Sequence, residues 1–360
     1  MPHLFDPLPL RGLTLSHRIF VSPMCQYSSI EGFATDWHFV HLGSRAVGGA
    51  ALVFTEATAV TADGRISPED LGIWNDNHID QLARIAAFVR GQGSVAGLQL
   101  AHAGRKGSTA APWNGGSGVP PASGGWQPVG PTSDSFTAGY PVPHALATEE
   151  IPAIPNAFKH AAARALAAGF DLVEVHAAHG YLIHQFLSPL SNTRRDQYGG
   201  SFQNRIRLCL EIVDAVRAVW PERLPIFLRL SATDWVPGGW DIDQAVELAR
   251  VLRTRGVDLI DCSSGGAAPQ AQIPIGPGFQ VPFAERIRRE ANIPTGAVGL
   301  ITEPGQADAI IRRGAADCVL LARELLRDPY WPRRAARELG HQLPWPRQYL
   351  RAAPPGTPSR

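Results

Sequence analysis

The sequence predicts an α/β protein and, within that class, a single (β/α)8 barrel. Short apolar runs alternate strictly with segments of helical periodicity, about eight times along the chain. A doubly wound sheet is the structural alternative, and it would usually carry a glycine-rich dinucleotide turn after its first strand. The first predicted strand is followed by Pro23-Met24-Cys25, which is not such a turn. The pattern therefore favours the barrel.

Each predicted strand is a short apolar run, and each predicted helix shows apolar residues on one face. The strands are expected at residues 19–22, 51–56, 95–100, 171–175, 225–230, 257–262, 294–298 and 316–321. The helices are expected at residues 36–47, 78–90, 154–168, 202–219, 242–255, 281–290, 304–313 and 330–339. Ser201 is a suitable N-cap for the helix that follows it, and Gly256 follows the helix that ends at residue 255.

The stretch from 105 to 150 interrupts this alternation after the third strand. It is rich in Gly, Pro and Ser, and a loop of this length is usually a lid, a binding loop or a disordered segment. Trp113, Trp126 and Phe136 are unusual contents for a disordered linker, so we expect a lid. The whole chain, residues 1–360, is then one domain with this insertion and a C-terminal tail over residues 341–360.

Composition limits the classes of partner. The formal net charge is +1 with His neutral, which gives no reason to expect a nucleic acid or an anionic membrane surface. The four cysteines are scattered without zinc or CxxC spacing. No signal segment or bilayer-spanning apolar run is evident. We expect a soluble, cytoplasmic protein that acts on small molecules.

Two histidines and a tyrosine, His176, His179 and Tyr181, lie where the fourth predicted strand ends. Two N–H donors can hold one oxygen, and a nearby O–H can deliver a proton. This set is suited to polarising a carbonyl or nitro group and protonating the neighbouring carbon. The histidines could instead be satisfied core residues or metal ligands. A metal-dependent hydrolase would need further His and carboxylate partners at other strand ends, and none is obvious.

The carboxyl ends of the other barrel strands are expected to face the same site. Gly299, Ala322 and Arg323 follow the last two strands, where barrels often bind phosphate through backbone N–H groups and cationic side chains. Gln99 offers an amide donor and acceptor, and Arg229 offers a permanent cation. Together they suggest a ligand with a phosphate tail and a polar ring, such as a flavin. Arg229 in a structural ion pair is the alternative.

Five segments carry a resemblance to a known family, and they occur in order along nearly the whole chain. They are Ser22-Pro-Met-Cys-Gln-Tyr27, Gln99-Leu-Ala-His-Ala-Gly-Arg-Lys106, His176-Ala-Ala-His-Gly-Tyr-Leu182, Arg195-Asp-Gln-Tyr-Gly-Gly-Ser-Phe-Gln-Asn-Arg205 and Leu321-Ala-Arg-Glu324. The sequence resembles the Old Yellow Enzyme family of FMN-dependent ene-reductases. Cys25, the paired histidines and the Gln-Tyr-Leu-Arg351 tail are similar to its YqjM-like and xenobiotic-reductase branch. Ala322 stands where that family usually has glycine.

The resemblance implies a cofactor and a role for each matching residue. Non-covalently bound FMN would be lined by Pro23, Met24, Cys25, Ala57, Gln99 and Arg229, with Gly299, Ala322 and Arg323 at its phosphate. Cys25 would tune the flavin, and Tyr27 would contact the substrate. NADPH or NADH would supply a hydride, which flavin N5 passes to the β-carbon of an α,β-unsaturated carbonyl or nitro compound. His176 and His179 would hold the substrate oxygen, and Tyr181 would protonate the α-carbon.

The resemblance also implies a homodimer, or a larger assembly, in which Arg351 reaches the neighbouring active site. Prolines at 344 and 346 predict an extended tail, and the alternative is a frayed surface terminus. Ala352-Ala353 replaces the glycine and aromatic residue usual after this arginine. Two rival assignments are a non-catalytic flavin-binding barrel and an iron–sulfur dienoyl reductase. The dienoyl reductase needs a cysteine cluster after the barrel, and no cysteine follows Cys318.

Overall fold

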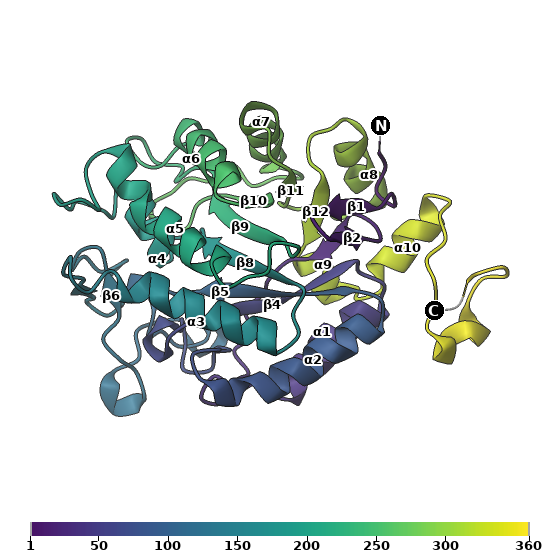
Figure 1. Ribbon diagram of the computed structural model, residues 1–360, viewed down its shortest axis with the longest axis horizontal. Coiled ribbons are helices and arrows are strands. Elements are labelled where there is room, and N and C mark those ends of the chain that lie inside the picture. Colours follow the sequence, from purple (N-terminus) through teal and green to yellow (C-terminus); the bar gives the residue numbers. More distant parts are fainter. Residues whose placement is uncertain (1, 359–360) are drawn as a thin grey trace.

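Eight parallel strands form a closed barrel in the computed structural model, which describes residues 2–358 (Figure 1). Their order around the barrel is β10-β11-β12-β3-β4-β5-β8-β9. The strands are β3 (Ile19–Val21), β4 (Leu52–Ala59), β5 (Val95–Ala101), β8 (Leu172–Ala177), β9 (Ile226–Ser231), β10 (Leu259–Ser263), β11 (Thr295–Ala297) and β12 (Cys318–Leu321). The predicted (β/α)8 barrel is confirmed.

Helices alternate with these strands and surround the barrel (Figure 1). They are α1 (Asp36–Val47), α2 (Ile79–Gly91), α3 (Ala153–Ala167), α4 (Leu182–Leu187), α5 (Phe202–Arg217), α6 (Ile242–Thr254), α7 (Val281–Ala291), α8 (Pro304–Arg312), α9 (Arg323–Arg327) and α10 (Trp331–Glu338). Eight of them lie within two residues of the predicted bounds. The sequence does not predict α4 and α9, which are too short to show an apolar periodicity.

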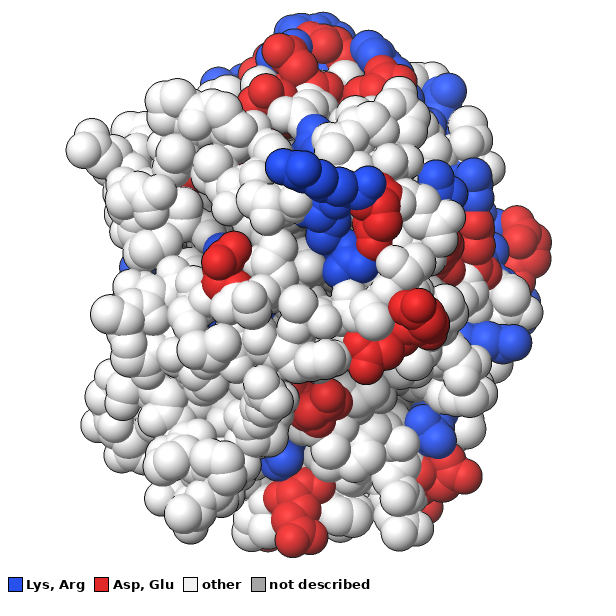
Figure 2. Space-filling view, turned by 90° about the vertical axis from the view of Figure 1, so that its left-hand side faces the viewer, with Lys and Arg blue, Asp and Glu red and all other residues white. Residues whose placement is uncertain are grey.

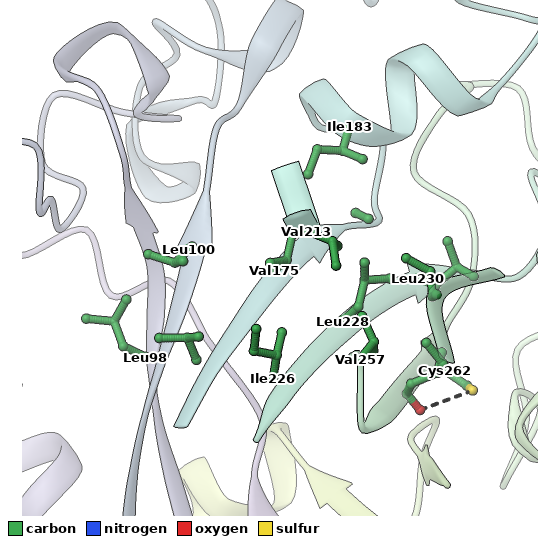
Figure 3. Packing of buried hydrophobic residues seen from close by; sticks show 14 of the residues in the cluster. Leu98, Leu100, Val175, Ile183, Val213, Ile226, Leu228, Leu230, Val257 and Cys262 are labelled. Carbon is green, nitrogen blue, oxygen red and sulfur yellow. Dashed lines mark hydrogen bonds between the residues drawn. The ribbon is translucent and has the colours of Figure 1, made fainter. Parts of the chain in front are cut away.

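Alternate residues of each strand face the surrounding helices, because successive side chains of a strand point to opposite sides. Figure 3 shows this outward set, with leucines of β5 and β9 and Val175 of β8 beside Ile183 of α4 and Val213 of α5. All of these side chains are buried. The layer between strands and helices is therefore the main hydrophobic core.

The inward-facing residues change from apolar to polar along the strands. A separate apolar cluster fills the amino end of the barrel and includes Phe20, Phe54, Leu172, Phe227 and Leu259. Two residues further along, the same sides of β8, β9 and β10 carry Glu174, Arg229 and Asp261, all buried. Polar side chains therefore gather toward the carboxyl ends of the strands.

A short antiparallel hairpin, which the sequence does not predict, covers the apolar end. It consists of β1 (Leu8–Leu10) and β2 (Leu13–Leu15). Leu8, Leu10 and Leu15 are buried in the same cluster as Phe20 and Phe227. This hairpin closes the amino end, so the polar end is the one left for a ligand.

The insertion at residues 105–150 and several short 3-10 helices stand outside the alternation of strands and helices. Residues 105–150 contain the 3-10 helices η4 (Pro112–Asn114) and η5 (Pro121–Ser123), and the two-residue strands β6 (Val129–Gly130) and β7 (His144–Ala145). Three further 3-10 helices lie beside the barrel elements. They are η1 (Ala62–Gly64) after β4, η2 (Asp76–His78) before α2 and η3 (Gly104–Lys106) after β5.

No helix within residues 2–358 combines the length and apolarity needed to cross a membrane.

The prediction of an extended C-terminal tail is wrong for part of the tail. Residues Arg347–Ala352 form the 3-10 helix η6. The backbone N–H of Tyr349 donates to the carbonyl of Pro346 at 2.9 Å, which begins this turn. A proline restricts itself and the residue before it, so the chain is free to turn after Pro346. The last two residues of the predicted tail, 359–360, lie outside the described part.

Candidate active site

His176 lies near the carboxyl end of β8 and is buried. The backbone N–H of Ala178 donates to its Nδ1 at 3.2 Å. A neutral imidazole that accepts at Nδ1 carries its proton at Nε2. Burial, and then the positive charge of Arg229, holds the pKa of His176 well below its usual value. The ring is therefore a neutral donor through Nε2.

His179 lies in the loop after β8 with a left-handed backbone, at φ +58°. Its backbone N–H donates to Ser231 Oγ at 3.0 Å, and its Nε2 lies 2.6 Å from Ser263 Oγ. Burial, followed by Arg229, also lowers the pKa of His179 well below the usual value. Ser231 and Ser263 stand at the ends of β9 and β10, so two other strands fix this histidine.

Tyr181 completes a cluster with the two histidines. Its ring centroid lies 5.0 Å from that of His176 and 6.5 Å from that of His179, and each pair of rings is nearly perpendicular. The two imidazole centroids are 5.1 Å apart. Burial, and then the neighbouring acidic groups of Cys25, Tyr27 and Asp70, raise the pKa of Tyr181 well above its usual value. The phenol therefore keeps its proton, and the structure brings together the three predicted catalytic residues.

The loop that carries His179 is held by close backbone packing. Gly180 has φ +74°, and a Cβ there would lie 2.0 Å from the carbonyl oxygen of Gly266. The N–H of Gly180 donates to Nδ1 of His184 at 2.9 Å. Nε2 of His184 lies 2.9 Å from Asp234 Oδ1 in a fully buried pair. The sequence does not predict this pair, since nothing in one sequence links residues 184 and 234.

The sequence also predicts no role for Lys106. Its Nζ donates to the carbonyls of His179 at 3.0 Å and Gly266 at 3.2 Å. The ammonium lies 4.4 Å from the ring centroid of Phe136 and 5.2 Å from that of Tyr181. Burial, and then the charge of Arg105, lowers the pKa of Lys106 to about 8. The lysine joins the β8 loop to the 105–150 insertion.

A cleft beside this cluster contains the predicted phosphate-binding residues. Its lining includes Ser22, Arg229, Ser263, Gly299, Ala322 and Arg323. Gly299 has φ +110°, a conformation that L side chains rarely adopt. Three guanidinium groups, those of Arg229, Arg323 and Arg327, line the cleft, and its one carboxylate, Glu324, is paired with Arg327 and Arg334. Such a cleft, lined also by small residues, is suited to an anion. Ser263 belongs both to this lining and to the His179 contact, so cleft and cluster adjoin.

Gln99 and Arg229 lie in the polar layer inside the barrel. Gln99 Nε2 donates to Glu174 Oε1 at 2.7 Å, which leaves the amide oxygen of Gln99 as an acceptor. Arg229 Nη1 donates to Ser22 Oγ at 3.0 Å, and its Nε lies 3.1 Å from Asp261. The ion pair that was the alternative role for Arg229 is thus present. The same side chain also lines the cleft.

The residues after β3 and along β4 form another side of the site. Pro23 and Met24 continue from β3, and Ala57 is in register with Gln99 beyond a bulge in β4. Burial, and then the neighbouring carboxyl groups of Asp70 and Glu56, raise the pKa of Cys25 well above its usual value, so this group is a thiol rather than a thiolate.

Tyr27 has φ +49°, and its ring meets that of Trp113 edge-on at 5.5 Å. Trp113 belongs to the 105–150 insertion, so this segment reaches Tyr27 as well as Lys106. The contact places an aromatic side chain of the insertion beside the residue predicted to contact substrate.

In the structure, Arg351 does not line the active site of its own chain. Its side chain is exposed. The C-terminal segment, yellow in Figure 1, stands out from the barrel on the side opposite β6 and α4. The prediction for this residue concerns a neighbouring chain, which is absent here.

The side of the molecule that carries β6 and α4 faces the viewer in Figure 2. The left part of this view is largely uncharged, and charged side chains of both signs lie mostly over its top, right and lower parts. Such a surface has no extended field of one sign on the side shown.

A family model described as the NADH:flavin oxidoreductase / NADH oxidase family matches residues 3–342. The chain belongs to this family. NADPH dehydrogenases of Geobacillus sp. strain WCH70 and Bacillus subtilis strain 168 are 49% and 46% identical to it over 350 residues, covering 97% of this chain and 98% of theirs. Morphinone reductase in complex with tetrahydroNAD has a TM-score of 0.79 at 30% identity, covering 96% of this chain and 93% of its own. An old yellow enzyme homologue from Zymomonas mobilis has a TM-score of 0.77 at 27% identity, covering 94% and 93%.

Membership of the NADH:flavin oxidoreductase family makes the chain a flavin-dependent oxidoreductase. The prediction of an enzyme similar to the Old Yellow Enzyme family is confirmed. Flavin and a nicotinamide nucleotide are accordingly the cofactors of the family. The metal-dependent hydrolase, which would use the same histidines as ligands, does not fit this assignment.

Proposed function

We propose that the chain is an FMN-dependent NAD(P)H:alkene oxidoreductase that reduces activated C=C bonds of α,β-unsaturated carbonyl or nitro compounds. One observation carries the proposal. Two neutral imidazoles and a protonated phenol, His176, His179 and Tyr181, lie within 6.5 Å of one another by ring centroids. Together they can hold an oxygen and protonate a carbon next to it.

The residues present fit FMN. Gly299, Ala322 and Arg323 line the cleft with small residues and a cation, which suits a phosphate. Arg229 and Gln99 offer a cation and an amide acceptor for the polar edge of the ring. Pro23, Met24, Cys25 and Ala57 would provide the neighbouring wall, with Cys25 as a polarisable thiol. When bound, FMN supplies the β-carbon of the substrate with a hydride taken from NADPH or NADH.

The protein side chains carry the remaining chemistry. His176 Nε2–H and an N–H of His179 donate to the substrate oxygen, on which negative charge grows as the double bond is reduced. Each such donor contributes about 3 kcal/mol of transition-state stabilisation. Tyr181, whose pKa is raised, gives its proton to the α-carbon. His176 is buried, and His179 and Tyr181 are half-buried, which limits the water that can compete for these donors.

The 105–150 insertion is proposed to cover the substrate. Phe136 packs on Lys106, which itself contacts the ring of Tyr181, and Trp113 contacts Tyr27. Aromatic side chains of the insertion thus reach two residues of the site. Trp126 Nε1 donates to the carbonyl of Asp63 at 2.8 Å, which ties the segment to the loop after β4. Tyr27 would then contact a substrate beneath the insertion.

A homodimer with shared active sites is proposed for the C-terminal tail. Tyr349 and Leu350 are exposed large hydrophobic side chains, and Arg351 is exposed beside them. Aromatic residues and arginine are enriched at protein interfaces. In this proposal Arg351 enters the partner's site beside flavin and substrate.

The four cysteines of the chain are all free thiols. Free buried thiols are usual where the cell keeps cysteines reduced. We therefore also propose a cytoplasmic location.

The decisive experiment follows the two half-reactions separately by flavin absorbance in a stopped-flow instrument. Tyr181→Phe is expected to leave flavin reduction by NADPH at its wild-type rate and to slow flavin reoxidation by an enone about 100-fold or more. The matched control is Tyr198→Phe, a buried tyrosine whose hydroxyl contacts Glu211 away from the cluster. Equal slowing of both half-reactions, or of neither, contradicts the role of Tyr181.

A further inference from the structure

A small cavity lies behind Tyr181, separate from the cleft that suits the flavin phosphate. Its lining consists mostly of alanine and glycine from β4, β5 and the loops after them, with Asp70 and Tyr181 as the two residues that can exchange protons. The cavity has room for about one water molecule. An acid and the proposed proton donor therefore border the same enclosed space.

Asp70 is buried, with 1% of its surface exposed. Its Oδ2 accepts from the backbone N–H groups of Ile66 at 2.7 Å and Ser67 at 3.3 Å. Its Oδ1 is also buried and has no hydrogen-bond partner among the described residues. An unpartnered oxygen of this kind is costly unless it is protonated or meets a water. The cavity provides the place for that water.

The charge state of Asp70 follows from its neighbours. Carboxyl oxygens of Asp70 and Glu56 and Sγ of Cys25 lie within 4.8 Å of one another. Glu56 lies 2.9 Å from His38 Nε2 and accepts from the N–H of Gln26 at 2.9 Å. Burial, and then the neighbouring Glu56, raise the pKa of Asp70 well above its usual value, while the N–H groups of Ile66 and Ser67, and then Arg65, act in the opposite direction without cancelling this rise. Asp70 is thus a carboxylic acid.

We propose that Asp70 resupplies the proton of Tyr181 through one water molecule in this cavity. This inference rests on the proposed reduction of alkenes. As the Tyr181 O–H bond breaks and its proton joins the α-carbon, the water gives a proton to the phenolate oxygen and takes the proton of Asp70. Asp70 becomes a carboxylate and regains a proton from solvent before the next turnover. The reaction consumes one solvent proton for each NADPH and alkene, so the proton count balances.

The relay predicts a particular solvent isotope signature. Proton transfer from Tyr181 alone moves one proton, whereas the relay moves three in a chain. The rate of flavin reoxidation by an enone, measured in mixtures of H2O and D2O, should therefore fall along a curve for the wild-type holoenzyme. Asp70→Asn keeps the size of the side chain but has no acidic proton. It should slow reoxidation about tenfold or more, turn the curve into a line, and leave reduction by NADPH unchanged.

Two further variants separate the relay from a structural role. Glu69→Gln changes a carboxyl group in the same loop that does not line the cavity, and it should behave as wild type. Ala101→Val fills the cavity while keeping Asp70, and it should reproduce the effect of Asp70→Asn. In the Tyr181→Phe background, Asp70→Asn should cause no further slowing, because the group it serves is gone.

The outcomes are distinct. A linear isotope dependence in the wild-type protein overturns the relay even if Asp70→Asn fails to fold. Unchanged reoxidation in both Asp70→Asn and Ala101→Val overturns it as well. A wild-type holoenzyme that does not transfer electrons from NADPH to any enone or nitroalkene refutes the proposed function itself, independently of Asp70.

Discussion

The loop after β8 and the C-terminal tail both contain predicted functional residues, yet they are held very differently. The loop is fixed by contacts far apart in sequence: His179 meets Ser231 and Ser263, Lys106 binds its carbonyl, and Gly180 packs on Gly266. The tail between 346 and 358 is held mainly by bonds over three residues, such as that from the N–H of Ala353 to Leu350.

The difference shows what each segment has to do. A donor pair for a growing oxyanion works only when its geometry is set before the reaction, so its backbone is locked by other strands. The C-terminal tail also contacts its own chain, through a hydrogen bond between Tyr349 and Tyr330 and one from the N–H of Trp345 to the carbonyl of Pro358 at 3.0 Å, but its large side chains remain exposed. What distinguishes the site within one chain from the surface proposed to meet a second chain is therefore how far contacts within the chain cover the side chains.

The largest expected effect comes from breaking the loop at Gly180. A methyl group there would meet the carbonyl of Gly266 at 2.0 Å, so Gly180→Ala should lower the free energy of unfolding by more than about 4 kcal/mol. Gly356→Ala is the matched control in the tail, because Gly356 has nearly the same φ, +77°, with nothing within 4 Å. That change should cost about 1 kcal/mol.

Urea unfolding of the two variants measures both effects. Similar losses of stability in the two variants would mean that the positive φ, and not the close approach of the two loops, determines the requirement for glycine.

A smaller expected effect is a loss of stability in acid, and it should also depend on the histidines at the end of β8 and in the loop after it. The pKa values of His176 and His179 are lowered mainly by burial, so the folded protein keeps both rings neutral where the unfolded chain binds protons. The free energy of unfolding should then fall as pH decreases below about 6.5, the ordinary histidine value. His176→Gln combined with His179→Gln should make this fall shallower.

Part of the acid sensitivity should remain in the double variant, because burial lowers the pKa of His41 to about 3 with the same sign. Truncation before Gln348 removes no histidine or carboxyl side chain and should leave the pH dependence unchanged. A double variant with the wild-type slope would show that the cluster is protonated already in the folded state.

The sequence predicts the barrel well because its signals are local. Asp36–Val47 and Ile242–Thr254 are amphipathic helices with clear ends, and the strands between helices are short apolar runs. The two strands of the hairpin, Leu8–Leu10 and Leu13–Leu15, are too short to show a period, and α4 follows the site tyrosine directly. Two prolines predict an extended tail, but they do not govern the six residues after Pro346.

The site is predictable only where its residues come from one segment or from strand ends. His176, His179 and Tyr181 are close in sequence, and the structure brings them together as expected. The partners that set their chemistry are not predictable in this way. Ser263, the His184–Asp234 pair and Asp70 meet the cluster through barrel closure and loop packing, and these contacts have no signature in a single sequence.

The smallest expected effect on stability, and the sharpest test of the comparison, is at Arg351. Because its side chain is exposed, Arg351→Ala should change the free energy of unfolding by less than about 0.5 kcal/mol. It should nevertheless lower turnover with enones if the residue enters a partner's site.

Mixing this variant with Tyr181→Phe decides which chain Arg351 serves. In a hybrid dimer with shared sites, the chain that keeps Tyr181 receives Arg351 from the Tyr181→Phe chain, so one site is complete and the activity of the mixture rises above the average of the two parents. If Arg351 acted within its own chain, no site in the hybrid would be complete, and the mixture would show only the average of the two parents. Mixing either variant with itself controls for the exchange procedure.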